Sequence, residues 1–249
     1  MNIINEIINN EKEYLNNTPL SNDYELSKLS TNEVHQIIID LLLEIDPNEE
    51  WLNIYLKARS TAHIIYTNEL NDEGIKKLEQ ILGLTGLKTL DNVCLNIDTN
   101  ESFVFLNYEG NISDVVFTMH ELIHYINARC DDIPNVNPMT REFPSIFYEL
   151  YALNYLYKLG YSKEELRSIY NKRIYESYQS LTMTERLGTN NISYAPYVIG
   201  DYLARCGIEQ TNYDKLLLPM IKYMTENLSK TSIEEIYYLL NPNNKKLKR

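Results

Sequence analysis

The segment 115–127 most limits what this chain can fold into and do. Its apolar residues follow a helical pattern, and three ionisable residues lie between them. The apolar residues recur at spacings of three and four, which predicts one face of a helix. They are Val115, Met119, Leu122, Ile123 and Ile126. We expect Ser113 or Asp114 to cap the start of this helix. His120 and His124 are four residues apart, so their imidazoles project from the same face one turn apart.

The ionisable residues form the pattern His-Glu-x-x-His, which is typical of zinc-dependent peptide hydrolysis. Imidazoles at the separation of His120 and His124 can reach one zinc ion at its preferred distance of ~2.0–2.1 Å. Glu121 lies roughly 100° further round the helix, beside the metal, where it can accept a proton from a water molecule. The alternative is a histidine pair on a polar helix face with a solvated glutamate. The flanking apolar residues argue against it, because burying these groups without partners is unfavourable.

A catalytic zinc keeps three protein ligands and one open position, so a third ligand is needed. Glu142 follows His124 by 18 residues, which leaves room for a turn-rich loop and a returning helix. We expect Asn137 to cap that helix, which would run to about Leu159. Pro144 would then lie in its second turn and kink it. Glu142 is the candidate third ligand.

Glu142 and Glu149 are seven residues apart and share one face of the predicted helix. Two carboxylates on a helix that is otherwise apolar and aromatic need partners. We expect Glu142 to bind the metal and Glu149 to orient one of the liganding histidines. The alternative is that one or both form structural ion pairs, with Arg141, Arg167 or Arg173 as the candidates.

Two runs of the sequence together resemble a known family of peptidases. Residues 103–124 resemble the catalytic core of the oligoendopeptidase F branch of the thimet-oligopeptidase-like zinc metallopeptidases. Glu142, Ser145 and Glu149 match the Glu-x-x-Ser-x-x-x-Glu segment of that family position for position. The resemblance implies a zincin-like catalytic core with Glu142 as the third zinc ligand. Ile123 stands where the family has a glycine.

The same resemblance extends to residues that would contact a peptide substrate. The family's extended Leu-Asn-Tyr stretch corresponds to a run containing Asn107 and Tyr108, which implies that these two bind substrate. A tyrosine-rich segment that ends in glycine is similar to 193–200 and implies that Tyr194 and Tyr197 donate hydrogen bonds in the transition state. A phenol aimed at a tetrahedral intermediate can stabilise its oxyanion. The alternative for both tyrosines is ordinary packing.

The periodicity predicts a mainly α fold in a single domain spanning 1–249, with a small β-hairpin or short sheet beside the zinc helix. We expect helices in 1–90 to form one wall of the cleft, among them a helix opened by a Ser30–Glu33 capping box and another over 51–70. The remaining parts are a catalytic core over 91–210 and C-terminal helices over 211–249. Within the core we expect a hairpin of 93–97 and 103–108 around a turn at 98–102, and a helix over 162–187.

Composition limits which partners the protein can bind and where in the cell we expect it. The net charge of −12 argues against a nucleic-acid surface, and the basic tail 245–249 is interpreted as a solvated terminus. Three widely spaced cysteines indicate no disulfide framework. No segment has the ~18 apolar residues of a membrane span, and the N-terminal sequence lacks the pattern of a signal peptide. We therefore expect a cytoplasmic protein without a membrane partner.

The sequence as a whole favours a zinc-dependent endopeptidase that holds one Zn²⁺ ion and acts on oligopeptides. Two alternatives remain open at this point. One is a regulatory metalloprotease that cuts a single protein partner. The other is a non-catalytic binding protein that keeps the metal as a structural element. The presence of Glu121 argues against the second, because a purely structural metal site needs no base.

Overall fold

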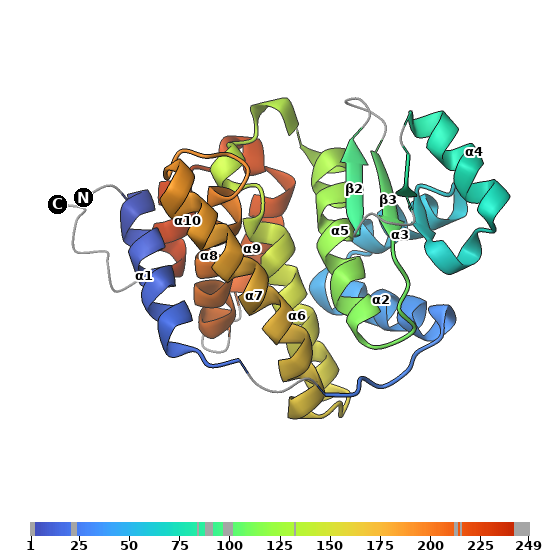
Figure 1. The fold of residues 1–249 in the computed structure, drawn as a ribbon, viewed down its shortest axis with the longest axis horizontal. Helices are drawn as coiled ribbons and strands as arrows, with labels where there is room; N and C mark the ends of the chain where they lie inside the picture. The colour runs from blue at the N-terminus through green and yellow to red at the C-terminus, as the bar shows by residue number, and fades with distance from the viewer. Residues whose placement is uncertain are drawn as a thin grey trace. The chain divides into compact units, whose positions relative to one another are not determined.

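The computed structural model describes residues 3–20, 24–83, 85–87, 92–96, 102–131, 133–211, 214 and 216–241. Over these residues the chain is mainly helical, with ten α-helices and a three-stranded sheet, which confirms the mainly α prediction (Figure 1). Contacts divide the chain into two compact units. The helical unit comprises 1–25 with 134–249, and the sheet unit comprises 26–133. A single domain over 1–249 stays a prediction.

The sheet unit contains four helices and all three strands. In chain order they are α2 (Thr31–Ile45), α3 (Glu50–Ser60), β1 (Ile64–Tyr66), α4 (Asp72–Leu82), β2 (Val93–Asn96), β3 (Ser102–Leu106) and α5 (Ser113–Cys130). The predicted capping box opens α2: the Ser30 side chain accepts from the Glu33 backbone, and the Glu33 side chain accepts from the Ser30 backbone. This exchange satisfies N–H groups that the first turn of a helix leaves unpaired.

The sheet has the order β1-β3-β2, so β3 is the central strand. β2 pairs with β3 antiparallel, with Cys94 opposite Val104, which confirms the predicted hairpin. The turn residues 98–101 lie outside the described residues. β1 pairs with β3 in the parallel direction, with Ile65 opposite Phe105.

The prediction of a helix over 51–70 was wrong. Helix α3 ends at Ser60, and Ala62 has a positive φ of 56°, which no right-handed helix can include. The β-branched pair that follows then lies in β1, where it pairs with β3. Pairing with a strand about 40 residues further along the chain outweighed the local helical pattern.

The long helix α5 packs on β2 and β3 and also contacts α2 and α3 (Figure 1). Its apolar residues Val115, Met119, Leu122, Ile123 and Ile126 are all fully buried. The predicted buried helix over 115–127 is therefore confirmed. Helices α2 and α3 pack on this helix, and the expected role of the N-terminal region as a wall of the cleft stays a prediction.

The helical unit contains six α-helices. They are α1 (Ile3–Asn17), α6 (Phe143–Lys158), α7 (Lys163–Leu187), α8 (Ala195–Thr211), α9 (Leu217–Glu226) and α10 (Ile233–Leu240). Helix α8 contacts each of the other five. Helix α1 packs on α7 and α8 in this unit. Contrary to expectation, it therefore belongs to a different unit from the other helices of 1–90. One apolar cluster consists of Ile8, Leu15, Ile174, Leu181 and Val198.

The starts of α6 and α7 test three local predictions. The predicted Ser162–Glu165 capping box opens α7. The Asn137 side chain accepts a hydrogen bond from a backbone N–H, as predicted, but the residues after it form a short 3-10 helix, Pro138–Thr140. The prediction that Pro144 kinks a helix was wrong, because α6 begins at Phe143 and Pro144 lies in its first turn. There proline removes no helical hydrogen bond.

Glu11 and Asp201 are buried carboxyl groups of the helical unit that have polar partners. Glu11 of α1 is fully buried and ion-paired with Arg205 of α8, whose guanidinium stacks 3.7 Å from the ring centroid of Tyr14. Asp201 of α8 is 2% exposed and accepts a hydrogen bond from the hydroxyl of Ser177. Burial raises the pKa of Asp201 to about 8.

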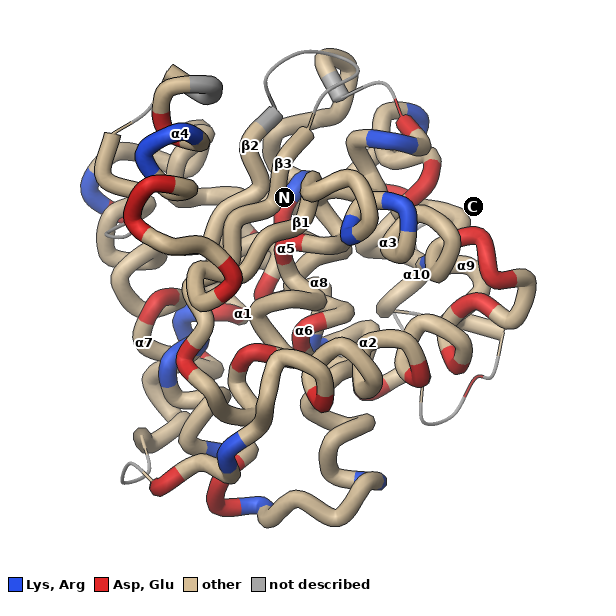
Figure 2. Tube along the Cα trace, turned by 90° about the vertical axis from the view of Figure 1, so that its right-hand side faces the viewer, with Lys and Arg blue, Asp and Glu red and all other residues tan. Residues whose placement is uncertain are grey.

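No helix among the described residues is both long and apolar enough to cross a membrane. The three cysteines, all within the described part, form no disulfide. Basic positions are dispersed among acidic ones along the described chain (Figure 2). The basic tail 245–249 lies outside it.

Asp201→Asn should make the stability of the protein less dependent on pH. A carboxyl group whose pKa rises from 3.8 to about 8 on folding binds its proton more tightly in the folded state. Its contribution to stability is therefore present at low pH and is lost as the pH rises towards 8. We expect Asp201→Asn to gain in free energy of unfolding relative to wild type as the pH increases from 5 to 9, measured by urea unfolding. A difference that does not change with pH would contradict this assignment.

Candidate metal site

The histidine pair lies on α5 in the sheet unit, as the spacing predicted. The ring centroids of His120 and His124 are 5.0 Å apart, and their planes are inclined at 74°. Both side chains are half-buried, between fully buried apolar residues of the same helix. Two imidazoles on one face, one turn apart, are the arrangement that can share a single ion.

Glu121 lies beside the histidines and is buried, with 8% of its surface exposed. Its charge acts on Cys94 of β2. Burial is the main cause of the raised pKa of the Cys94 thiol, and the charge of Glu121 is the next. The carboxylate of Glu121 therefore lies within electrostatic reach of the sheet.

The loop before α5 is fixed by Asp114. Its carboxylate accepts hydrogen bonds from the backbone N–H groups of Glu109, Gly110 and Asn111, at 2.9, 2.8 and 3.0 Å. Burial raises the pKa of Asp114, and these hydrogen bonds oppose the rise. The prediction that Ser113 or Asp114 caps the helix was wrong, because the N-cap residue is Ile112 and it makes no side-chain cap. Asp114 instead folds back and holds the preceding turn.

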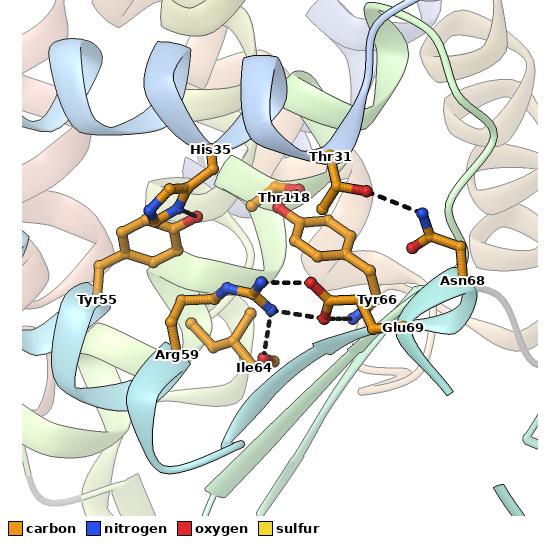
Figure 3. A network of polar contacts seen from close by, with 9 residues as sticks. All are labelled: Thr31, His35, Tyr55, Arg59, Ile64, Tyr66, Asn68, Glu69 and Thr118. Carbon is orange, nitrogen blue, oxygen red and sulfur yellow. Dashed lines mark hydrogen bonds and ion pairs between the residues drawn. The ribbon is translucent and has the colours of Figure 1, made fainter. Parts of the chain in front are cut away.

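A polar network ties α5 to the sheet and to α2 and α3 (Figure 3). The hydroxyl of Tyr66, at the end of β1, lies 3.1 Å from Oγ1 of Thr118, two residues before His120. Burial raises the pKa of Tyr66 to about 12, so this phenol stays neutral. Arg59 lies over the Tyr66 ring and forms a two-point ion pair with Glu69, at 2.5 and 2.9 Å. The histidine helix is thus fastened by polar contacts as well as by apolar packing.

The remaining histidines of the sheet unit are engaged in local contacts. Nδ1 of His35 lies 2.9 Å from the hydroxyl of Tyr55, as Figure 3 shows. Nδ1 of His63 lies 2.6 Å from Oγ1 of Thr61, and its ring stacks on Phe103. Both side chains therefore have partners within the sheet unit.

Glu142 lies in the helical unit, at the N-cap position of α6, and only 2% of its surface is exposed. Nε of Arg141 lies 3.4 Å from its Oε1, but the Arg141 side chain is half-exposed. Helix α8 approaches Glu142 closely at Gly200. A Cβ atom added there would lie 3.1 and 3.2 Å from the carbonyl carbon and Cβ of Glu142 and 2.9 Å from Cδ1 of Ile146. Glycine at this position therefore allows α8 to support the residue.

Glu149 follows on the same side of α6 and is 4% exposed. Its Oε1 lies 3.3 Å from Nε of Arg173 on α7. The sequence left open that these glutamates form ion pairs, and both do. Glu149 pairs with Arg173, and Glu142 pairs with Arg141. Neither ion pair excludes a role at a metal, and orientation of a histidine by Glu149 stays a prediction.

The two residues predicted to bind substrate after β3 are engaged within the sheet unit. The backbone N–H of Asn107 donates to Oδ1 of Asn92 at 2.6 Å. The hydroxyl of Tyr108 donates to the backbone carbonyl of Leu29, and its backbone N–H donates to Oγ1 of Thr67. Tyr108 therefore serves at least to close this loop, and its contact with substrate stays a prediction.

The two candidate donor tyrosines lie at the start of α8. Tyr194 precedes the helix and lines a groove of about 610 Å³ on the outer face of α7. Its neighbours there are Leu20, Tyr175, Tyr178, Gln179, Thr182 and Met183. Tyr197 is half-buried in the first turn of α8. The transition-state role of both stays a prediction, and the groove shows that Tyr194 has apolar neighbours.

Within each unit the structure brings together what the spacing predicted: His120, Glu121 and His124 on α5, and Glu142 and Glu149 on α6. Sequence reasoning missed the contribution of Tyr66 and Gly200, and it named Arg173 only as one of several possible partners. Neither a comparison with models of protein families nor searches of curated proteins and of solved structures found a match.

A double-mutant cycle tests whether Tyr66 fastens the histidine helix through Thr118. Tyr66→Phe and Thr118→Val should each lower the free energy of unfolding by about 1 kcal/mol, the usual contribution of one neutral hydrogen bond. The double variant should lose little more than either single variant, because the same bond is removed. Urea unfolding measures all four proteins. Fully additive losses would mean that the two hydroxyls do not interact.

Proposed function

We propose that this chain is a zinc-dependent endopeptidase with a zincin-like core, similar to the oligoendopeptidase F branch of the thimet-oligopeptidase-like family, that cleaves oligopeptides. The observation that carries the proposal is the pair of imidazoles on one face of buried helix α5, with centroids 5.0 Å apart and the buried carboxylate of Glu121 beside them. A buried helix has no structural need for three such groups, because burying them is unfavourable unless they bind something.

The proposed ligands are His120, His124 and Glu142. They offer two ring nitrogens and one carboxylate oxygen, a group that can hold a metal ion. This donor set fits zinc, which accepts nitrogen and oxygen ligands and in catalytic sites keeps three protein ligands. When bound, zinc supplies Lewis-acid catalysis, since it lowers the pKa of water to about 7 and polarises a carbonyl oxygen.

Glu121 is the proposed general base and acid. Its carboxylate takes one proton from the attacking water as the water oxygen bonds to the carbonyl carbon of the scissile peptide. It then gives this proton to the nitrogen as the carbon–nitrogen bond breaks, which releases an amine and a carboxylic acid.

Tyr197 and Tyr194 are the proposed hydrogen-bond donors to the developing oxyanion. Loss of such a donor costs roughly 3–4 kcal/mol of transition-state stabilisation in other hydrolases. Asn107 and Tyr108 follow the central strand β3 and are proposed to contact the peptide backbone.

Glu121→Gln should retain zinc and lose peptide hydrolysis by several orders of magnitude, because the amide cannot accept the proton of water. The measurement is digestion of a mixed peptide library by zinc-loaded wild type and variant, with products read by mass spectrometry and zinc content by elemental analysis. Equal zinc content is the control that the site is intact. Turnover in Glu121→Gln equal to that of wild type would remove Glu121 from its role.

The same experiment separates the rival functions. Zinc binding without cleavage of any library peptide by wild type would favour a protease for one dedicated protein, or a binding protein. Wild type without zinc would refute the metal assignment itself.

Gly200→Ala should weaken zinc binding by about tenfold, because the added methyl group displaces the backbone of Glu142 or the side chain of Ile146. Gly207→Ala is the matched control on the same helix, where the new methyl would lie 3.0 Å from the ring of Phe147 instead. Both should lower the free energy of unfolding by about 1–3 kcal/mol. Competition with a chromophoric chelator measures zinc affinity, and equal affinities in the two variants would argue against Glu142 as a ligand.

A further inference from the structure

Three polar residues line one buried face of α5 in the sheet unit. Asp114, Thr118 and Glu121 are spaced by four and then three residues, so on a helix they lie within about 60° of one another. Their exposed fractions are 3%, 1% and 8%. His120 and His124 lie roughly 60–100° further round the helix from Glu121. The proposed general base therefore shares its face with two buried polar residues that are not themselves proposed metal ligands.

Asp114 attaches this face to the turn that precedes α5. Its carboxylate accepts hydrogen bonds from three successive backbone N–H groups, those of residues 109–111, at 2.9, 2.8 and 3.0 Å. Successive N–H groups in a turn can converge into a concave site for an anion, and the positive φ of 77° at Gly110 suits such a turn. A carboxylate has two acceptor oxygens, so it can accept all three bonds. Asp114 therefore holds the whole turn.

The turn is itself fixed to another segment of the sheet unit. The backbone N–H of Leu29 donates to the carbonyl oxygen of Gly110, and the N–H of Ile112 donates to the carbonyl oxygen of Ser27, both at 3.0 Å. The hydroxyl of Tyr108 also donates to the carbonyl oxygen of Leu29. Asp114 thus ties the start of α5 to a turn that backbone hydrogen bonds hold in place.

Thr118 gives the same face of α5 a second anchor, one turn further along. Its Oγ1 lies 3.1 Å from the hydroxyl oxygen of Tyr66 (Figure 3). Tyr66 is held in turn, because the guanidinium of Arg59 lies 4.9 Å from its ring centroid and its backbone N–H donates to Oε2 of Glu69 at 3.1 Å. A single anchor leaves a helix free to turn about its axis, whereas two anchors on one face also fix its rotation.

We propose that Asp114 is a positioning residue that, together with Thr118, sets the rotation of α5 and thereby the directions of Glu121, His120 and His124. The inference rests on the proposed function, in which these three residues hold zinc and activate water. Apolar packing is non-directional, whereas hydrogen bonds select one orientation of the helix. Orientation matters at such a site, because a misplacement of about 1 Å can lower a rate by about a hundredfold.

The alternative is that Asp114 only closes its turn and stabilises the fold. Asp46 offers a matched control in the same unit, because it is 1% exposed and its carboxylate also accepts backbone hydrogen bonds. The donors are the N–H groups of Asn48 at 3.3 Å and Trp51 at 3.0 Å, so Asp46 holds the turn between α2 and α3. Loss of either carboxylate should destabilise the fold, but only loss of Asp114 should change the metal site.

The test compares wild type, Asp114→Ala, Asp114→Asn and Asp46→Ala. Competition with a chromophoric chelator measures zinc affinity, the absorption spectrum of the cobalt-substituted protein reports ligand geometry, and urea unfolding of the metal-free proteins reports stability. We expect Asp114→Ala to bind zinc about tenfold more weakly, with an altered cobalt spectrum. Asp114→Asn keeps one acceptor oxygen and should lie between Asp114→Ala and wild type. Asp46→Ala should lose stability but keep the affinity and spectrum of wild type.

Peptide hydrolysis by the zinc-saturated proteins reports the placement of Glu121. We expect Asp114→Ala to lower kcat by about a hundredfold with little change in KM, because the base is misplaced while the substrate still binds. Asp46→Ala should keep the kcat of wild type. The affinity and the cobalt spectrum need no peptide, so they test the inference even if wild type cleaves no peptide in the library.

Each other result overturns the inference. The affinity and spectrum of wild type in Asp114→Ala would show that Asp114 only closes its turn. An equal change in Asp46→Ala would show that general destabilisation disturbs the site. If Asp114→Ala does not fold, a spectrum in Asp114→Asn identical to that of wild type would be decisive against the inference. Wild type that binds no zinc would overturn the proposed function and this inference together, whereas normal binding in wild type and in Asp114→Ala would overturn only the inference.

Discussion

The burial of ionisable side chains on two apolar helices is the constraint on which this structure depends. Helix α5 carries His120, Glu121 and His124 among fully buried aliphatic residues, and α6 carries Glu142 and Glu149 among buried aromatic ones. Such groups lose the solvation that stabilises their charged forms, so each unit must supply polar partners in compensation. Each unit does so in a different way.

In the sheet unit, the polar support of the histidine helix comes from neutral side chains and from backbone N–H groups. Asp114 accepts three backbone hydrogen bonds before α5, and Tyr66 reaches Thr118 from the end of β1. These contacts fix the N-terminal end and one side of the histidine helix, and none of them brings a cation to the imidazoles. Such support suits a site that would bind a cation, since orientation of the ligands is set by groups around them.

In the helical unit, compensation comes from arginines, of which Arg173 is buried and Arg205 is half-buried. Arg173 and Arg205 each face a buried glutamate, and Asp201 between them on the chain keeps its proton up to about pH 8. Helix α8 can bring its groups close to α6 because Gly200 and Gly207 leave room for the neighbouring side chains. The glycines thus allow α8 to pack closely on α6. The buried charges then favour the packing in which each of them has a partner.

The sequence by itself determined the features that depend on residues a few positions apart. These are the shared face of His120 and His124, the capping boxes at Ser30 and Ser162, and the hairpin of β2 and β3. Local hydrogen bonds and helical spacing fix such features, so they can be read from a short stretch of chain.

Only the tertiary structure decided the features that depend on distant partners. The segment Ile64–Tyr66 became a strand because β3 pairs with it, against a local pattern that favoured a helix. The choice of Arg173 from three candidate partners of Glu149, and the close approach of Gly200 to Glu142, required the packing of α7 and α8 on α6. The physical reason is that these contacts join residues tens of positions apart, and their stability depends on burial that exists only once the whole unit has folded.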